Sequence, residues 1–293
     1  MSFFVKNIDI NDSSKTIKNY LLSKYLSGEK IKFLLNNNCC YVNGMVVSEN
    51  YELTINDVLC IDTCFFDNLD YSPTENKIDI LYEDEYLLLV NKPAKCIIYD
   101  DAKYDTMANY IAYYYMTKDL EYKIRHAHRL DYDTSGCLLY AKDIITHAAV
   151  NKIIEDGSFK RYYLAVVENE FDNKSGKINY NIGKDRHING KMIISKTGKK
   201  AVTNYVVKKK FKGYSLVSLL LETGRTHQIR VHMSAIKHPL VGDSMYGSTT
   251  KFSRVLLHSH KVNFIHPITN KHIVIECPIP VDMVDFINKK SAN

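Results

Sequence analysis

Hydrophobic and polar positions repeat with two periods along the chain, and these periods predict both helices and strands. In several segments apolar side chains recur every three or four residues after a capping residue, as in amphipathic helices. Helices are predicted over residues 14–26, 30–36 and 143–157, from a cap at Asp105 through Tyr114, and from a cap at Thr226 to His238. Apolar or alternating runs predict strands near residues 41–47, 58–62, 78–82, 86–90, 137–140, 159–167, 201–207, 214–222 and 273–277. Strands therefore outnumber helices, and Asn43-Gly44 predicts a type I′ hairpin turn.

A polar, turn-forming segment at residues 67–76 divides the chain. Because this segment has no hydrophobic period, we place the domain boundary there, with a small domain over 1–70 and a large one over 71–293. The two parts differ in charge. The first holds six Lys and nine Asp/Glu, whereas the second holds 33 basic and 24 acidic side chains.

The basic excess is concentrated in residues 184–212, which contain ten Lys/Arg and a single acid, Asp185. Two interpretations of this stretch remain open. It can be the solvated face of a hairpin, or a strip that attracts the phosphate backbone of a nucleic acid.

The composition is that of a globular protein. Hydrophobic residues make up 45% and charged residues 25% of the 293 residues, which excludes collagen-like and disordered chains. No apolar run approaches the ~20 residues that a membrane span needs, and the first residues lack a leader pattern, so we expect a soluble, unexported protein. The seven cysteines are odd in number and scattered, which favours a reducing cytoplasm over a disulfide framework.

Two polar clusters are candidates for chemistry. The first, His126 to Gly136, directly precedes an apolar strand, and its end, Asp133-Thr134-Ser135-Gly136, is by itself typical of a turn. The second, residues 222–233, places Arg225 and Arg230 around a predicted strand–turn–helix junction. Backbone N–H groups and the helix dipole at such a junction suit a phosphate or a carboxylate, although a single buried arginine more commonly forms a structural pair with aspartate.

The sequence lacks the motifs of several common sites. Cys60 and Cys64 have no second cysteine or histidine pair at zinc-finger spacing, so no metal is expected. Phosphate-binding loops, dinucleotide fingerprints, zincin motifs and serine elbows do not occur. We therefore expect a reaction that needs neither a metal nor an organic cofactor.

Taken together, the two clusters resemble the RluA-type pseudouridine synthase family. The resemblance rests on His128-Arg129-Leu130-Asp131-x-Asp133-Thr134-Ser135-Gly136, followed later by Thr223-Gly224-Arg225-Thr226-His227-Gln228-Ile229-Arg230-Val231-His232. Shorter matches at Asn91-Lys92-Pro93, Arg161–Ala165, 198–203 and His238–Gly247 extend it over roughly residues 78–280. It implies an α+β fold with a mixed, mainly antiparallel central sheet, flanking helices and an RNA cleft.

The resemblance also implies roles for individual residues. The family's catalytic aspartate falls on Asp131, its active-site tyrosine on Tyr163 and its active-site arginine on Arg230. Arg129 matches the arginine that supports base flipping. Further contacts with the RNA are expected from basic residues of the motifs and of the basic stretch, namely Arg225, His227, Lys199 and Lys200.

These roles agree with the chemistry of the isomerisation that the family performs. Moving uracil from its nitrogen–ribose bond to a bond through carbon five calls for a nucleophile, which Asp131 supplies if it is ionised. Arg230 can orient this carboxylate and favour its charged form. Tyr163 offers a ring for stacking and a hydroxyl for proton transfer, although without the resemblance it would be assigned to a strand core.

We further expect structured RNA as the substrate, with ribosomal RNA ahead of transfer RNA, and we take a monomer as the default oligomeric state. Flipping a base is least costly where the uridine is already unpaired. Three mechanisms remain open: attack on the ribose, addition to the base, or proton abstraction toward a glycal. A binding-only RNA factor is the main alternative, whereas an aspartic protease is disfavoured because Asp133-Thr134-Ser135-Gly136 lacks the immediate glycine and has no second copy.

Two positions depart from the family pattern. Lys95 replaces the glycine of Asn-Lys-Pro-x-Gly, and Arg161 replaces the lysine of Lys-x-Tyr-x-Ala, which puts the local loop shape in question. The first 70 residues resemble, more weakly, a small alpha-L RNA-binding module. That resemblance runs through Tyr41-Val42-Asn43-Gly44 and Asn56-Asp57-Val58, but the segment is net acidic, which opposes phosphate binding.

Overall fold

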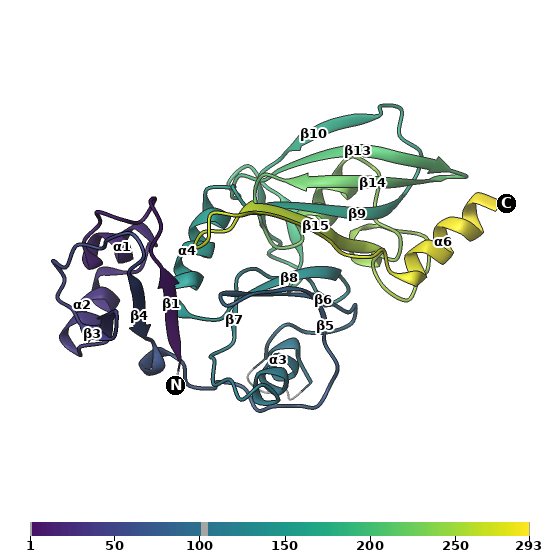
Figure 1. Ribbon diagram of the computed structural model, residues 1–293. Helices are drawn as coiled ribbons and strands as arrows, with labels where there is room; N and C mark the ends of the chain where they lie inside the picture. The colour runs from purple at the N-terminus through teal and green to yellow at the C-terminus, as the bar shows by residue number, and fades with distance from the viewer. Residues whose placement is uncertain (1, 101–104, 293) are drawn as a thin grey trace.

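The computed structural model describes residues 2–100 and 105–292. Its first part is a four-stranded antiparallel sheet in the order β1-β4-β2-β3, with two short helices packed against it (Figure 1). The elements are β1 (Phe3–Asn7), α1 (Ile17–Ser23), α2 (Gly28–Asn36), β2 (Cys40–Val42), β3 (Met45–Val46), β4 (Val58–Asp62) and η1 (Cys64–Phe66). The predicted hairpin turn is confirmed, since Asn43 and Gly44 have φ angles of 52° and 81°.

The second part is built on a ten-stranded sheet whose main path runs β10-β13-β14-β9-β15-β8-β6-β5. Its strands are β5 (Asp79–Glu83), β6 (Leu87–Lys92), β7 (Arg125–His126), β8 (Ser135–Ala141), β9 (Lys160–Glu168), β10 (Ser175–Asn179), β13 (Val202–Phe211), β14 (Tyr214–Leu221), β15 (Leu257–Ile265) and β16 (His272–Glu276). Within the described residues, only β15 and β8 pair in parallel. The mixed, mainly antiparallel α+β fold expected from the sequence is thus confirmed.

Four helices, a 3-10 turn and a small ribbon flank this sheet. They are α3 (Met107–Met116), α4 (Ile144–Glu155), α5 (Gln228–Ala235), α6 (Val281–Ala292), η2 (Ser244–Tyr246) and the pair β11 (Ile182–Lys184) and β12 (Met192–Ile194). Buried side chains of α3 pack with those of β6 and β8 in one core cluster. In Figure 1, α6 lies at the end of the large sheet remote from the small sheet.

Two predicted helix caps are wrong. Thr106, not Asp105, caps α3. Its hydroxyl oxygen accepts a hydrogen bond from the Asn109 N–H, and the Asn109 side-chain oxygen accepts one from the Thr106 N–H. At α5 the cap position is His227, whose left-handed φ of 54° leaves Thr226 outside the helix. The predicted helix over 14–26 is also shorter, since Thr16 caps α1 and Ser14 has a φ of 63°.

The small sheet packs directly against the large one. The ring of Phe4 on β1 packs against the ring of Tyr86, with 5.6 Å between the ring centroids. The Tyr86 hydroxyl donates to the Val5 carbonyl at 2.6 Å. Lys24 at the end of α1 donates to the Pro267 carbonyl across the same interface. One cluster of buried apolar side chains therefore continues from the first part into the second. None of the helices within residues 2–100 and 105–292 is long and apolar enough to cross a membrane.

Candidate active site

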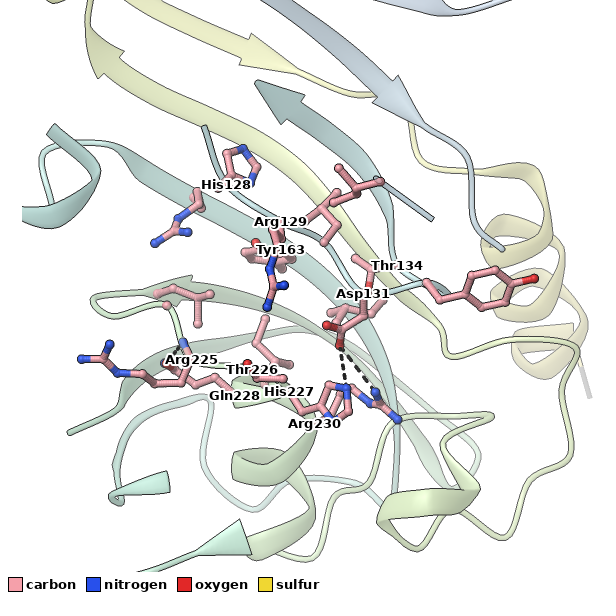
Figure 2. A pocket seen from close by; sticks show the side chains of 18 of the residues that line it. His128, Arg129, Asp131, Thr134, Tyr163, Arg225, Thr226, His227, Gln228 and Arg230 are labelled. Carbon is pink, nitrogen blue, oxygen red and sulfur yellow. Dashed lines mark hydrogen bonds and ion pairs between the residues drawn. The ribbon is translucent and has the colours of Figure 1, made fainter. Parts of the chain in front are cut away.

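The two polar clusters of the sequence face each other across a cleft of about 720 Å³ (Figure 2). One wall comes from the loop before β8, the opposite wall from the turn before α5, and β9 forms the floor between them. The register of the sheet explains why the two clusters lie on opposite sides of one cleft. Tyr163 on β9 pairs with Leu219 of β14 on one side and with Ser259 of β15 on the other, and Ser259 pairs in turn with Gly136 of β8.

Gly136 is required for this arrangement. Its φ of 108° lies in the left-handed region, and an added Cβ would lie 2.2 Å from the Ser259 carbonyl oxygen. The close approach lets β8 start beside β15, and it brings the preceding loop, which carries Asp131, to the edge of the cleft.

Asp131 lies in that loop, with its side chain 30% exposed. The loop is held from behind by two buried cations. Lys92 donates to the carbonyl of Tyr132 at 3.3 Å, and Arg254 donates to that of Asp133, also at 3.3 Å. Burial lowers the pKa of Lys92 to about 8. The two carbonyls that follow the aspartate are therefore fixed, while the carboxylate faces the cleft (Figure 2).

Arg230, in the first turns of α5, approaches this carboxylate, with Nη1 3.5 Å from Asp131 Oδ2. Its Nε and Nη2 donate to the two carboxylate oxygens of the buried Asp243, at 2.7 and 2.8 Å. Burial disfavours the charged guanidinium, but the bonds to Asp243 and the charge of Asp131 outweigh that effect and raise the pKa of Arg230. The guanidinium also lies over the Tyr246 ring, 4.9 Å from its centroid.

His227 is the second group beside Asp131, with Nε2 3.9 Å from Oδ2. Its Nδ1 is 2.9 Å from the hydroxyl of Tyr246, which already accepts from the Met192 N–H at 2.9 Å. When the Tyr246 hydroxyl donates its hydrogen to Nδ1, the imidazole proton lies on Nε2, facing Asp131. Burial lowers the pKa of His227 in spite of the nearby carboxylate, so the ring is neutral at pH 7.

Tyr163, Arg129 and Arg225 complete the cleft. Tyr163 is 5% exposed, and burial raises the pKa of its hydroxyl, which is therefore protonated at neutral pH. Arg129, which also lines the cleft, donates to the hydroxyl of Tyr99 at 3.4 Å. Arg225 at the opposite rim donates to the backbone carbonyl of Lys200 at 3.1 Å.

Lys199 and Lys200 do not line the cleft but lie next to it. Both are exposed, in the segment between β12 and β13, where the Lys199 N–H pairs with the Ile182 carbonyl. The basic stretch 184–212 is not one continuous strip, because β13 is extended. Lys209 lies seven residues along β13 from Val202, roughly 23 Å away, so the lysines at 208–212 are distant from those at 184–200.

Sequence reasoning missed several residues that organise the site. Asp243 and Tyr246 stand in the quoted motif His238–Gly247, and Lys92 in Asn91-Lys92-Pro93, but none had been given a role. Arg254 lay outside every motif. Their positions along the chain carry no signal of the contacts, since each meets the site only in the folded protein. Among the described residues, no group of three or more His, Cys, Asp or Glu side chains could hold a metal ion.

Comparisons with known proteins agree with this geometry. The family model described as RNA pseudouridylate synthase matches residues 86–235, which include both polar clusters. The Bacillus subtilis RNA pseudouridine synthase YhcT is 39% identical over 268 residues, covering 90% of this chain and 86% of the relative. The ribosomal large subunit pseudouridine synthase D of Zymomonas mobilis is 34% identical over 278 residues, covering 88% and 87%.

A solved structure shows the same architecture. The human RNA pseudouridylate synthase domain containing 1 superposes with a TM-score of 0.60 at 26% identity, over 71% of this chain and 86% of that one. With a family match that spans both walls of the cleft and relatives similar over nearly their whole length, the chain belongs to the RluA-type RNA pseudouridine synthases, isomerases that act on RNA.

Proposed function

We propose that this synthase converts unpaired uridines of structured RNA, ribosomal RNA ahead of transfer RNA, with Asp131 as its nucleophile and the target base flipped into the cleft. The observation that carries the proposal is the position of the Asp131 carboxylate, which faces a cleft of about 720 Å³ and lies 3.5 Å from Arg230. The ribosomal preference is supported by the similarity to the ribosomal large subunit pseudouridine synthase D of Zymomonas mobilis.

The product is an isomer of uridine with the same atomic composition. The bond between uracil N1 and ribose C1′ breaks, a bond between C5 and C1′ forms, the C5 proton leaves, and N1 takes up a proton. The Asp131 carboxylate, rather than a water molecule, acts as the nucleophile toward the reacting nucleotide. The step is redox-neutral, so it calls for neither a metal nor an organic cofactor. Attack on the ribose, addition to the base and a glycal route all start from the same ionised carboxylate.

The neighbouring side chains each suit one part of this reaction. Arg230 and Nε2 of His227 face Asp131 Oδ2, where they can orient the carboxylate toward the reacting nucleotide. Tyr163 presents a largely buried ring on which uracil can stack and a protonated hydroxyl that can move a proton. Arg129 lies at the mouth of the cleft, where it can fill the space that a flipped base leaves in the RNA.

Outside the cleft, exposed basic side chains contact the RNA backbone. Arg225, Lys199 and Lys200 form a continuous group, since Arg225 bonds the Lys200 carbonyl. We further propose that residues 1–70 are a separate module that contacts the RNA weakly, that residues 71–293 are the catalytic domain, and that the enzyme acts as a monomer in the cytoplasm.

The test is tritium release from C5-tritiated uridine. Ribosomal and transfer RNA from a strain that lacks this gene are incubated separately with the wild-type protein and with Asp131→Asn, which keeps the shape of the side chain. The proposal expects release from ribosomal RNA by the wild type only. Release by Asp131→Asn at the wild-type rate would show that Asp131 is not the nucleophile. Release from transfer RNA alone would show that transfer RNA, not ribosomal RNA, is the substrate.

A further inference from the structure

Arg161 is a buried arginine of the cleft whose Nε has no partner among the residues that the structure describes. It lies on β9, lines the cleft, and is 9% exposed. Its Nε is fully covered and has no hydrogen-bond partner among the residues that the structure describes. The same part of the chain provides it with no ion pair.

The other arginines with little exposure are all paired with carboxylates. Arg125 meets Asp67 at 2.6 Å, Arg254 meets Asp282 at 2.5 Å, and Arg230 is held by Asp243. A buried guanidinium without an anion is costly, because the charge loses water and gains nothing in return. Unpaired charges of this kind persist where a ligand supplies the missing partner.

The walls around Arg161 leave room for its side chain, and no carboxylate of the described residues lies within ion-pair distance of it. A Cβ added to Gly224 would lie 3.1 and 3.2 Å from its two terminal nitrogens, so the guanidinium lies close against the backbone of this turn. His128 on the other wall is neutral, since burial, aided by the charge of Arg161, lowers the pKa of its ring to about 3. Among the described residues, no carboxylate thus forms an ion pair with this guanidinium of the cleft.

We propose that Arg161 binds a backbone phosphate of the substrate RNA, at the nucleotide next to the flipped uridine. Arg161 and Tyr163 are two residues apart on the same face of β9, a separation of roughly 6.6 Å. A base stacked on Tyr163 therefore leaves Arg161 beyond the ring, beside the sugar–phosphate chain. The planar fork of the guanidinium matches two phosphate oxygens, whereas an uncharged uracil carbonyl would leave its charge uncompensated.

This inference rests on the proposed function for the identity of the flipped base, but its test does not depend on catalysis. The probe is a fluorescein-labelled nonauridylate, and binding is followed by anisotropy over a KCl series. The variants are Arg161→Met, which keeps the length of the side chain without charge, and Arg161→Lys, which keeps the charge. Lys208→Met, which removes an exposed charge near the far end of β13, is the matched control.

The expected result for Arg161→Met combines weaker binding with a more stable apoprotein. Its dissociation constant rises by about tenfold or more, and the slope of log K against log salt becomes shallower by about 0.7. Its melting temperature without RNA rises, because an uncompensated buried charge has been removed. Arg161→Lys keeps the wild-type slope, and Lys208→Met changes neither the slope nor the affinity.

A second probe separates phosphate from base recognition. An abasic ribose-phosphate nonamer carries the same charges without uracil, and Arg161→Met is expected to weaken its binding by the same factor. Weakening confined to the nonauridylate, with an unchanged salt slope, would assign Arg161 to the base and overturn the proposal. A lower melting temperature together with an unchanged salt slope would make Arg161 a structural residue and also overturn it.

The outcome is independent of the tritium assay. If no tritium is released by the wild type while the Arg161 variants behave as expected, the phosphate contact stands and the isomerase mechanism falls. If Asp131→Asn abolishes release but Arg161→Met binds both probes as the wild type does, the mechanism stands and the phosphate contact falls.

Discussion

Asp243 takes two nitrogens of Arg230, at 2.7 and 2.8 Å, so that only Nη1 of this guanidinium reaches toward Asp131, at 3.5 Å. The buried aspartate thus sets the direction from which the arginine meets the proposed nucleophile. This relationship makes Asp243 a positioning residue for the pair.

Asp243→Asn is therefore expected to reduce catalysis without blocking RNA binding. The amide cannot hold both nitrogens as a carboxylate does, and a displacement of Arg230 by about 1 Å lowers kcat by about 100-fold. Single-turnover tritium release measures the rate, and KM for the RNA should remain within about twofold of wild type. Circular dichroism serves as the folding control, and a well-folded variant with wild-type kcat would show that Asp243 does not position Arg230.

Asp282 on α6 acts on the loop of Asp131 through Arg254. The carboxylate holds Arg254 at 2.5 and 2.7 Å, and Arg254 donates to the Asp133 carbonyl. The backbone of Arg254 also packs against the residue before Asp243, since a Cβ on Gly242 would lie 2.1 Å from the Arg254 carbonyl oxygen. A remote helix is therefore connected to both halves of the Asp131–Arg230 pair.

Asp282→Asn should lower both stability and kcat. Loss of a charge-assisted bond reduces the free energy of unfolding by about 1.5–3 kcal/mol, and the looser loop reduces kcat while KM changes little. Urea denaturation and single-turnover assays measure the two effects. Asp285→Asn, an exposed aspartate on the same helix, is the matched control. Equal behaviour of the two variants would contradict a link from α6 to the loop.

His128 predicts a loss of stability in mild acid. Burial lowers the pKa of this ring from 6.5 to about 3, so between these values the unfolded chain binds a proton that the folded chain does not. The stability contributed by neutral His128 is complete above pH 6.5 and is lost as the pH falls toward 3. The slope for this one group is about 1.4 kcal/mol per pH unit.

Comparison with His128→Gln isolates this effect from other titrating groups. Glutamine can keep an acceptor for the Leu139 N–H, which bonds Nε2 of the histidine at 3.4 Å. Urea denaturation at about pH 7, 6 and 5 is expected to show the wild type losing stability faster than the variant. Parallel curves would mean that His128 takes up a proton in the folded protein.

The two ends of the basic stretch are expected to contribute differently to RNA binding. Lys199 and Lys200 lie beside the cleft, whereas Lys208 and Lys210 lie toward the far end of β13. Replacing the first pair by glutamine should make the slope of log K against log salt shallower by about 1.4 for single-stranded RNA. The second double variant carries the same charge change and should bind as the wild type does. An equal loss in both would place the RNA along the whole of β13.

Local sequence alone was enough for many elements and for the family. The Asn43-Gly44 turn, the helix α4 and the alternating strand β14 depend on residues close together in the chain, and each was predicted correctly. The motifs around Asp131 and Arg230 identified the family because they are long and specific. Whether residues 1–70 fold and bind RNA separately stays a prediction.

Only the tertiary structure decided which residues meet. Strand β1 went unpredicted because five residues become a strand by pairing with β4, more than 50 positions away. Asp131 and Arg230 are 99 residues apart. They meet because β9 pairs with β14, which precedes the second cluster, and with β15, which pairs in turn with β8 after the first cluster. Arg161 reads as a conservative change in a motif, and its missing counter-ion is visible only in the cleft. Periodicity records neighbours within a few residues, whereas a site depends on sheet register, burial and charge, which arise when distant segments pack together.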